Sequence, residues 1–560
     1  MTDNTRTTIG ATGQQRERSD AAPLVFGSLA LSLHAQDRLL PRWIFFRALG
    51  LIYFSAFFSL VFQIRGLIGP NGILPTGDYL ESVARSLPGV ARYWYAPSLY
   101  WIFSSAHAQL TICWIGLIGS LLLVVNIWPR GMLVVCFVCF ISFVAASADF
   151  SSYQSDGMLL EAGFISFFFA PPGFLPGIAR EHPPMRLSLF LLQWEWFRIY
   201  FESGAVKLLS GDPQWRNFTA MDEYYQNGPL PTWIGWYLQH APHSFQAFTV
   251  GATLVMELGL VWLILFPQPI RRVLFCIVTA WEVGVIATAN YAFLNYLVLS
   301  LGILLVDDEF VLKFIPQRWK LRLASKLQVQ EQGPPSQNVF ASDRGNDSGA
   351  SFARTAKRLG IAISTVLLAW VFYSTSVQLL LMFWPRAPLP KAPVIALDPF
   401  RIANRYGLFA VMTRGRYEIE FQGSNDGKQW IAYPFRYKPQ ALDQKPKIFA
   451  PYQPRFDWNL WFASLGTWRE NPIVPSTEVS LLQNDRDVLT LFAGNPFPNQ
   501  PPKLIRAVIW QYWFTSIAEK HKTGNWWRRE LLGTYAPTLA LGSNGKIAII
   551  EEPNAPGPRE

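Results

Sequence analysis

Long apolar runs separated by short polar stretches dominate the chain before Trp384. A membrane hydrocarbon core of about 30 Å needs about 20 helical residues, because each residue rises about 1.5 Å along the helix. Runs of this kind lie at 44–64, 110–128, 131–148, 157–175, 186–208, 244–266, 271–289, 291–306 and 359–383. The pattern predicts a polytopic α-helical membrane bundle with about nine spans.

After the last apolar run, the sequence changes to patterns with a period of two. The stretch YEIEFQGSNDGKQWIAYPFRY alternates on both sides of Asn425-Asp426-Gly427, where glycine supplies the positive φ that a hairpin turn needs. Two amphipathic helices and a further strand are predicted at 455–465, 477–492 and 504–514. We therefore expect a C-terminal α+β, β-rich soluble domain.

Lys and Arg residues beside the spans indicate the orientation. The segment 307–358 is strongly basic, whereas the loops near 149–156 and 290 contain neither Lys nor Arg. Because basic residues flanking spans stay on the cytosolic side, we expect a cytosolic N-terminus and a non-cytosolic C-terminal domain. The predicted parts are a disordered cytosolic tail (1–40), the bundle (41–306) with its outer signature loop (207–243), a basic cytosolic segment with a linker (307–358), a final span (359–384) and the exported domain (385–560).

The composition supports a membrane protein and argues against a nucleic-acid partner. The chain is 51% hydrophobic and 15% charged, whereas soluble chains carry about 25% charged residues. Its net charge of +10 comes from basic residues beside the apolar runs, with no basic and aromatic stripe that would follow a phosphate backbone. No cysteine follows Trp384, so the exported domain has no disulfides. This favours a bacterial inner membrane facing the periplasm, with an endoplasmic reticulum membrane facing the lumen as the alternative.

Several ionisable residues lie within the predicted spans, where each costs about 2.5–3.5 kcal/mol on insertion scales. Glu195, Arg198 and Glu202 are three and four residues apart, so they share one helix face. Asp156 and Glu161 open the fourth span. Two interpretations remain open: internal ion pairs that lock the bundle, or a polar cavity that opens to the outside. If the protein is an enzyme, the candidate catalytic residues are Glu202, Arg198, Glu161 and Asp156.

The outer loop after the fifth span is rich in aromatic residues and proline. Its prolines exclude one continuous helix, and Trp and Tyr are typical of the membrane interface. We expect it to bind a partner. Its candidate binding residues are Lys207, Asp212, Trp215, Arg216, Asp222, Tyr224, Tyr225 and Gln226.

This loop resembles the lipase maturation factor family, together with YQSDGMLLEAGF upstream and NRYGLFAVMTRGRYEIEFQGSNDGKQW and PYQPRFDWNLWFASL downstream. The resemblance implies a polytopic membrane protein that helps secreted lipases reach their active fold; the best-known members reside in the endoplasmic reticulum. It places Asp156, Glu161, Arg198, Lys207, Gly211, Asp212, Trp215, Pro229, Pro231, Asn404, Tyr406, Gly407, Arg455, Asp457 and Trp458 at characteristic family positions. It also adds Arg455, Asp457 and Trp458 to the candidate binding residues.

The chain departs from many family members at Tyr224-Tyr225-Gln226-Asn227-Gly228, where they carry His-Tyr-Glu-Thr-Gln. A titratable His and Glu are missing here, which puts an acid/base role for the loop in doubt. The family is also distantly like membrane enzymes of the vitamin K-dependent carboxylase type.

The sequence contains no GxSxG, HExxH, P-loop or dinucleotide fingerprint, and we expect neither a metal nor a cofactor. The first hypothesis is a membrane-anchored folding or maturation factor. Its expected partners are an exported client protein, of which a lipase is the family's example, and membrane lipids. The second hypothesis is a membrane enzyme that acts on a lipid or an exported polypeptide.

Overall fold

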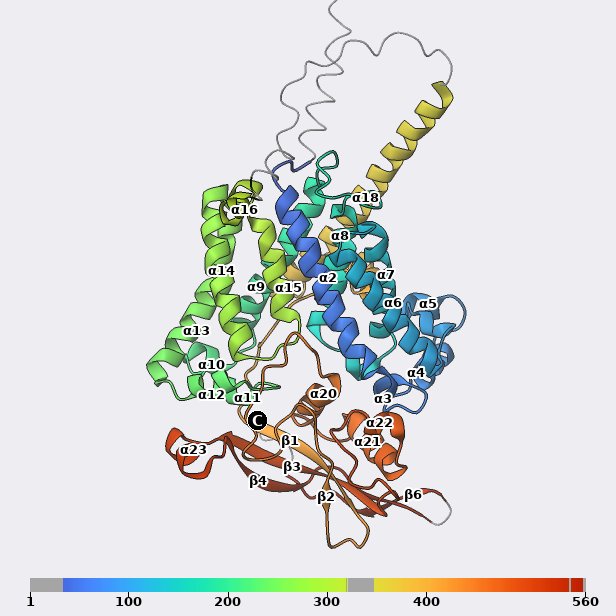
Figure 1. Ribbon diagram of the computed structural model, residues 1–560, viewed down its shortest axis with the longest axis vertical. Coiled ribbons are helices and arrows are strands. Elements are labelled where there is room, and N and C mark those ends of the chain that lie inside the picture. The colour runs from blue at the N-terminus through green and yellow to red at the C-terminus, as the bar shows by residue number, and fades with distance from the viewer. Residues whose placement is uncertain (1–33, 319, 321–346, 543–544, 557–560) are drawn as a thin grey trace, which may run out of the picture.

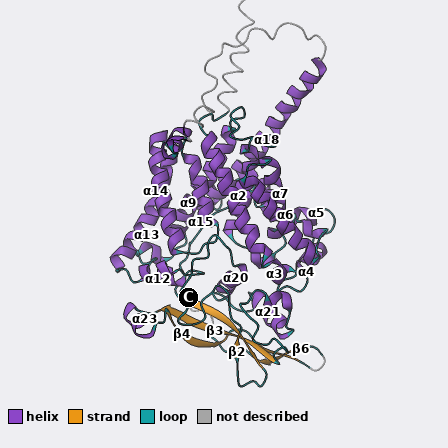
Figure 2. Ribbon diagram, in the orientation of Figure 1, coloured by secondary structure: helices purple, strands orange, loops and turns teal. Residues whose placement is uncertain are grey.

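The computed structural model describes residues 34–318, 320, 347–542 and 545–556. Helices form one part of the molecule and an antiparallel sheet lies at its opposite end (Figures 1 and 2). Most of the predicted N-terminal tail and of the predicted linker within 307–358 lies outside the described residues.

Each of the predicted apolar spans forms a helix. The helices are α2 (Leu39–Val61), α6 (Ala106–Val124), α7 (Pro129–Val144), α8 (Gln154–Phe169), α9 (Arg186–Leu209), α13 (His243–Leu258) with η3 (Leu260–Leu265), α14 (Gln268–Thr288), α15 (Leu294–Gly302) with η4 (Ile303–Leu305), and α18 (Asp347–Phe383). They pack side by side, and α9 contacts α8, α13, α15 and α18. This central position of α9 places its charged face inside the bundle.

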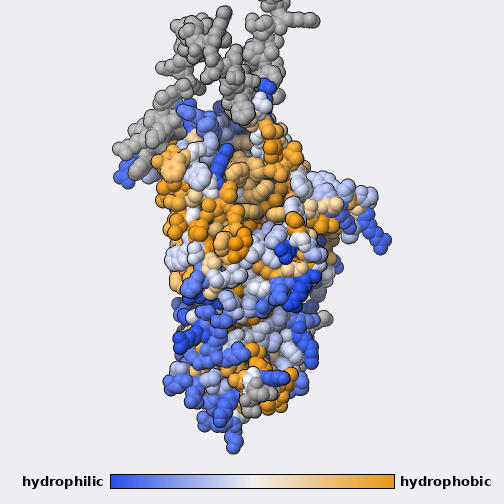
Figure 3. Space-filling model, turned by 90° about the vertical axis from the view of Figure 1, so that its right-hand side faces the viewer, coloured by the Kyte–Doolittle hydropathy of each residue, from blue (hydrophilic) through white to orange (hydrophobic). Residues whose placement is uncertain are grey.

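Within the described residues, four helices are long and apolar enough to cross a membrane: 39–61, 106–124, 243–265 and 358–383. The helices at 129–144 and 294–305 are apolar but shorter. A span count of nine therefore stays a prediction. The face in Figure 3 has a mostly apolar surface over the helical part and a more polar surface over the C-terminal domain, as expected for a membrane protein with a soluble domain.

Short helices line the end of the bundle that faces the sheet. They are α3 (Ile64–Ile68), α4 (Thr76–Ser86), α5 (Ala91–Tyr95), η1 (Leu99–Trp101), η2 (Ala148–Ser151), α10 (Pro213–Arg216), α11 (Tyr224–Asn227) and α12 (Trp233–Gln239); α16 (Asp308–Phe314) lies at the other end. In the outer loop, the Asp212 carboxylate caps α10, where Pro213 is the first helical residue. The Thr232 hydroxyl caps α12 in the same way. Polar caps and prolines thus divide the loop into short helices.

Six strands form the sheet of the C-terminal domain. They are β1 (Arg416–Ser424), β2 (Ile431–Ala432), β3 (Leu504–Phe514), β4 (Trp527–Thr534), β5 (Thr538–Leu541) and β6 (Ile547–Glu551). Their order is β2-β1-β3-β5-β6, and β4 also pairs with β3. The hairpin predicted around Asn425-Asp426-Gly427 is present: Gln422 pairs with Ala432, and Gly427 has a φ of +70°.

The remaining helices are α19 (Ala392–Leu397) and η5 (Asp398–Phe400), of which α19 packs against α18, and α20 (Arg455–Ala463), α21 (Ile473–Leu482), α22 (Arg486–Leu489) and α23 (Ile517–Thr523) in the C-terminal domain. α20 contacts β1, and α21 contacts β3. The helix predicted over 477–492 is instead broken into α21 and α22. The break occurs because Asn484 has a φ of +55° and the Asp485 carboxylate caps α22.

Candidate functional site

An extended segment, 401–413, links the bundle to the sheet and runs across the bundle end that faces it. We call this segment the strap. Its anchors are polar groups of α8 and α9 and of the outer loop. The strap therefore joins the C-terminal domain to partners that lie 194–253 residues earlier in the sequence.

The charged face of α9 is paired inside the bundle. Arg198 forms an ion pair with Glu161 of α8, and its Nη1 donates to the carbonyl oxygen of Asn404 in the strap at 2.7 Å. Glu202 is 3.9 Å from Arg198 and accepts a hydrogen bond from the main-chain N–H of Tyr406 at 2.6 Å. Arg198, Glu161 and Glu202 are all fully buried. This geometry favours internal locking over an open polar cavity.

Asp156 belongs to a different pair, which was not apparent from the sequence. Its two carboxylate oxygens accept hydrogen bonds from Nη1 and Nη2 of Arg455 at 2.7 and 2.8 Å. Arg455 also donates to the carbonyl of Phe150, and both charged side chains are buried. This bidentate pair fixes α20 of the C-terminal domain to the start of α8.

The first half of the outer loop is held by the bundle and the strap. Lys207 Nζ lies 2.8 Å from both carboxylate oxygens of Glu257 on α13. Asp212 accepts a hydrogen bond from the N–H of Met412 at 2.7 Å, and Trp215 Nε1 donates to the carbonyl of Phe409 at 3.0 Å. All three predicted binding residues are buried: Asp212 and Trp215 hold the strap, whereas Lys207 connects α9 to α13.

The second half of the loop contacts the sheet. Gln226 Oε1 accepts from the N–H of Phe514 at 2.8 Å, and Tyr225 is also buried. Asp222 pairs with His243 at 2.9 Å, whereas Arg216 is exposed and donates to the carbonyl of Leu208. The loop therefore lies between bundle and sheet.

A buried charge cluster supports this contact from the side of the sheet. Arg416 donates to the carbonyls of Gln226 and Pro229 and pairs with Glu418, which also lies 2.9 Å from Lys438. The Asp457 carboxylate accepts hydrogen bonds from the main-chain N–H groups of Tyr437 and Lys438 at 3.2 and 3.1 Å. Burial raises the pKa of Asp457 to about 6, although the hydrogen bond from Lys438 opposes the rise.

An aromatic cavity of about 390 Å³ lies between bundle, outer loop, strap and α20. Its aromatic lining is Tyr153, Tyr224, Tyr291, Phe409, Trp458, Trp461 and Phe462. Among the predicted binding residues, Tyr224 and Trp458 line it. Two apolar lining residues are strongly exposed: Val411 (68%) and Phe462 (46%). The cavity therefore offers an apolar interior with an accessible mouth.

Comparison with known proteins places the chain in a family. The family model described as lipase maturation factor transmembrane domain matches residues 40–313, and the model described as lipase maturation factor C-terminal domain matches residues 402–537. The chain belongs to the lipase maturation factor family. No solved structure matches it.

Individual relatives match over nearly the whole chain. Lipase maturation factor 1 of Bos taurus is 29% identical over 523 residues, which cover 91% of this chain and 90% of that protein. Lipase maturation factor 2 of Gallus gallus is 29% identical over 587 residues (90% and 82%), and lipase maturation factor 2 of Homo sapiens is 28% identical over 595 residues (90% and 83%).

Both regions matched by the lipase maturation factor models contribute residues to the site. The first ends after the start of α16, and the second begins at Ile402 in the strap. The aromatic cavity takes residues from both matched regions, for example Tyr224 from the first and Trp458 from the second. The site therefore exists only where the two family domains pack together.

Four residues important to this site were not singled out in the sequence: Tyr291, Phe409, Trp461 and Arg416. Trp461 lies three residues after Trp458, a spacing that places both on one face of α20. The others lie on separate elements, so no local pattern could have grouped them.

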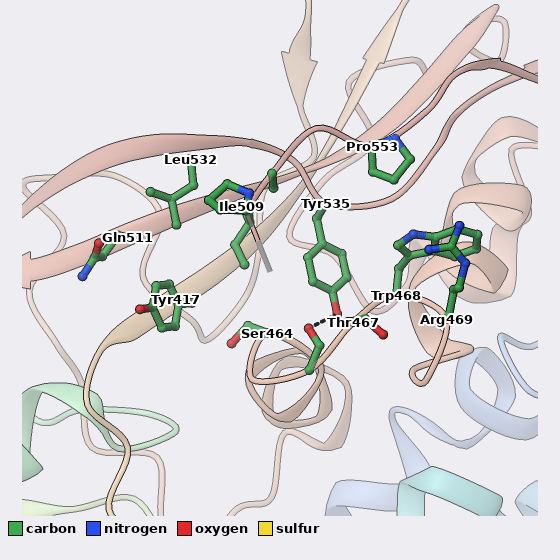
Figure 4. Close-up of a pocket in the computed structure, with 13 residues that line it drawn as sticks. Tyr417, Ser464, Thr467, Trp468, Arg469, Ile509, Gln511, Leu532, Tyr535 and Pro553 are labelled. Atoms are coloured by element: carbon green, nitrogen blue, oxygen red, sulfur yellow. Dashed lines mark hydrogen bonds between the residues drawn. The ribbon is translucent and has the colours of Figure 1, made fainter. Parts of the chain in front are cut away.

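A smaller cavity of about 220 Å³ lies inside the C-terminal domain (Figure 4). Tyr535 points from the sheet toward Ser464 and Thr467, and its hydroxyl donates to the carbonyls of Ala463 and Gly466 at 2.5 and 3.1 Å. Pro553 covers one side. This cavity is a weaker candidate because it is smaller and because Tyr535, Ser464 and Thr467 on its wall already form hydrogen bonds within the chain. Among the described residues, no group of His, Cys, Asp and Glu is arranged to hold a metal ion.

Proposed function

We propose that this chain is a membrane-anchored maturation factor that holds an exported client protein, a lipase, while the client reaches its active fold. The observation that carries the proposal is the aromatic cavity at the junction of the two family domains. Its interior is apolar and its mouth is exposed at Val411 and Phe462. Such a surface can bury an apolar side chain or segment of an incompletely folded client without covalent chemistry.

The proposed setting is a bacterial inner membrane, with the N-terminus in the cytosol and the C-terminal domain in the periplasm. The relatives are named lipase maturation factors, which supports a lipase as the client. The candidate catalytic residues support a structural role instead of chemistry, because Asp156, Glu161, Arg198 and Glu202 are paired and buried.

The test measures the specific activity of a secreted lipase at equal lipase mass, with and without this protein. The double variant Val411→Ser/Phe462→Ala removes apolar contact surface at the mouth without opening the core. We expect it to lower lipase maturation at least fivefold, since truncating a central contact residue commonly costs about 1 kcal/mol or more.

The matched control is Ile517→Ser, which removes a similarly exposed apolar side chain on α23, away from the cavity. It should leave maturation unchanged. Equal effects of the control and the double variant, or no effect of the double variant at normal protein level, would contradict a client site at the cavity.

Glu202→Gln separates this proposal from an enzyme that uses Glu202. A glutamine oxygen can still accept the hydrogen bond from the Tyr406 N–H, and Arg198 keeps Glu161 as its partner. We therefore expect maturation within about threefold of the parent, because one retained hydrogen bond limits the loss. Complete loss of maturation with a normally folded variant would favour catalysis.

A further inference from the structure

A second large cavity lies at the end of the bundle opposite the sheet. It has a volume of about 640 Å³ and takes residues from the starts of α2 and α7, the end of α8, the segment before α9, and α18. In Figure 1, α18 diverges from the other helices toward this end. Gly360 of α18 has open space where a side chain would project, and Ile361 is 45% exposed. The cavity is therefore open on the side of α18.

Two arginines face this cavity without a carboxylate partner. Arg42 is buried and donates to the main-chain carbonyls of Ile178, Ala179 and His182 at 2.7–3.0 Å. Arg130 donates from Nε to the carbonyl of Ala170 at 2.9 Å. Among the described residues, no Asp or Glu carboxylate oxygen lies within 4.0 Å of a guanidinium nitrogen of Arg42 or Arg130. Carbonyl dipoles hold both guanidinium groups in place but do not neutralise them.

The nearest acidic group outside the lining is Asp308, which acts on Arg42 from more than 4.0 Å away and accepts a hydrogen bond from the Leu40 N–H. Glu181 lines the cavity but is exposed, and His34 and His182 line it as well. The helices α2 and α7 both begin here, with Arg42 and Arg130 in their first turns, and Met185 is the residue directly before α9. The N-terminal ends of α7 and α9 carry partial positive charge that reinforces the two arginines, whereas the Asp308 carboxylate already caps the start of α2. The charge pattern favours an anion.

Apart from Gln36 and Ser364, the rest of the lining is apolar or glycine. Phe167 and Phe168 at the end of α8 line the cavity together with Ile361 of α18. Both α8 and α18 belong to the helical part of the molecule, over which Figure 3 shows a mostly apolar surface. A soluble anion would use only the arginines, whereas a lipid would use both the arginines and the apolar cleft.

We propose that this cavity binds an anionic phospholipid. Its phosphate lies between Arg42 and Arg130, and an acyl chain lies in the cleft between α8 and α18. Basic pockets between membrane helices are known places for anionic lipid head groups. The bound lipid would fill the gap left by the divergence of α18 and so fix that helix against the bundle.

The test uses the purified full chain in neutral detergent and native mass spectrometry. Phosphatidylglycerol and phosphatidylcholine with identical acyl chains are added separately, and the retained lipid is titrated. We expect selective retention of phosphatidylglycerol. Arg130→Gln should weaken it about fivefold, the equivalent of ~1 kcal/mol for one basic residue near an anionic head group. Arg42 is left intact because it also holds the 178–182 turn.

The matched control is Arg271→Gln on α14. Arg271 also donates to a main-chain carbonyl at the same end of the bundle, but it does not line the cavity. This variant should retain phosphatidylglycerol like the parent. Equal weakening by both variants, or equal retention of both lipids by the parent, would overturn the proposal.

A second variant tests the acyl cleft without changing any charge. Gly360→Trp should fill the mouth of the cleft and reduce phosphatidylglycerol retention at least fivefold. Gly284→Trp is its control, because Gly284 is another helical glycine with open space around its missing side chain. Unchanged retention with Gly360→Trp would contradict the acyl site. If inorganic phosphate at millimolar concentration displaces the lipid completely, the site takes a free anion and the lipid proposal is wrong.

Discussion

Buried charges at the contact between bundle and C-terminal domain are paired across large sequence separations. Arg455 neutralises Asp156, and Arg198 neutralises Glu161. Such pairs do not guarantee extra stability, because removing two charges from water is costly. Breaking one of them, however, leaves a charge in a region that water cannot reach. The consequence is that these residues report on whether the two domains are docked.

Asp156→Asn should destabilise the folded protein by about 3–5 kcal/mol, because the buried Arg455 then lacks its counter-charge. Thermal unfolding in detergent and the folded yield measure this effect. The control is Glu81→Gln in the exposed pair with Arg85, which should cost about 1 kcal/mol or less. The double variant Asp156→Asn/Arg455→Met should recover part of the loss. Equal destabilisation by Asp156→Asn and Glu81→Gln would disprove a buried pair.

Asp457 should make the stability depend on pH. Its pKa in the folded protein is about 6, above the value of an ordinary Asp, because burial disfavours the charged form. The folded state then binds more protons than the unfolded state, so stability falls as pH rises from about 4 to about 6. The loss is about 3 kcal/mol at most, since one pKa unit corresponds to about 1.4 kcal/mol.

Asp457→Asn should remove this slope, which thermal unfolding of the full chain at several pH values measures. Asp426 provides the opposite case: it is exposed, and hydrogen bonds from the N–H groups of Gln429 and Lys428 lower its pKa. Asp426→Asn should leave the slope between pH 4 and 6 in place. A slope that persists in Asp457→Asn would have another origin.

At the scale of elements, the strap decides how the two domains interact. It contains no helix or strand, yet Asn404 and Tyr406 bind the charged groups of α8 and α9. In contact with the outer loop, the Met412 N–H donates to the Asp212 carboxylate, and the Phe409 carbonyl accepts from Trp215 Nε1. The strap is therefore part of the bundle in its contacts, although it belongs to the C-terminal family domain in the sequence.

Two truncations should differ because of the strap. Deleting 391–560 removes the partners that Asn404 and Tyr406 provide, and so leaves the buried carboxylates less satisfied. Deleting 414–560 keeps them. We expect both truncated chains to insert and to lose client maturation, but the longer deletion should give a clearly lower folded yield in detergent, since an unsatisfied buried polar group costs about 1–3 kcal/mol. Similar yields would mean that the strap does not stabilise the bundle.

At the scale of the whole molecule, the membrane orientation sets which surfaces a client can reach. The aromatic cavity lies at the end of the bundle that carries the sheet, and α16 lies at the opposite end. If the C-terminal domain is outside, the cavity faces exported proteins and the proposed lipid cavity faces the inner leaflet. The orientation therefore determines which proteins can reach the aromatic cavity and which leaflet can supply the proposed lipid.

Single cysteines at Lys428 and Gln317 should respond oppositely to a membrane-impermeant thiol reagent in intact cells. Both positions are exposed, and Lys428 lies on the C-terminal domain while Gln317 follows α16. We expect labelling at Lys428→Cys and protection at Gln317→Cys in a Cys276→Ala background. After the membrane is opened, both should react. The reverse pattern in intact cells would invert the predicted topology.

The sequence by itself determined the elements and the family. Hydrophobic runs predicted the helices, because a segment in lipid must satisfy its own backbone hydrogen bonds. Asn425-Asp426-Gly427 predicted the hairpin, because a local turn depends on local backbone preferences. The spacing of Glu195, Arg198 and Glu202 predicted a shared helix face, and the folded chain places Arg198 and Glu202 beside each other.

Only the tertiary structure decided the partners and the cavity. Asp156 is 299 residues from Arg455, and Glu161 is 243 residues from Asn404, so no local rule links them. The aromatic cavity likewise joins Tyr224, Tyr291 and Trp458 from separate elements. Helical periodicity and turn preferences act over a few residues, whereas partner choice depends on how the strap crosses the bundle. Packing of α8 against α9 and α20 converts scattered charges into ion pairs, and the strap, the outer loop and α20 together bring scattered aromatic residues into one cavity.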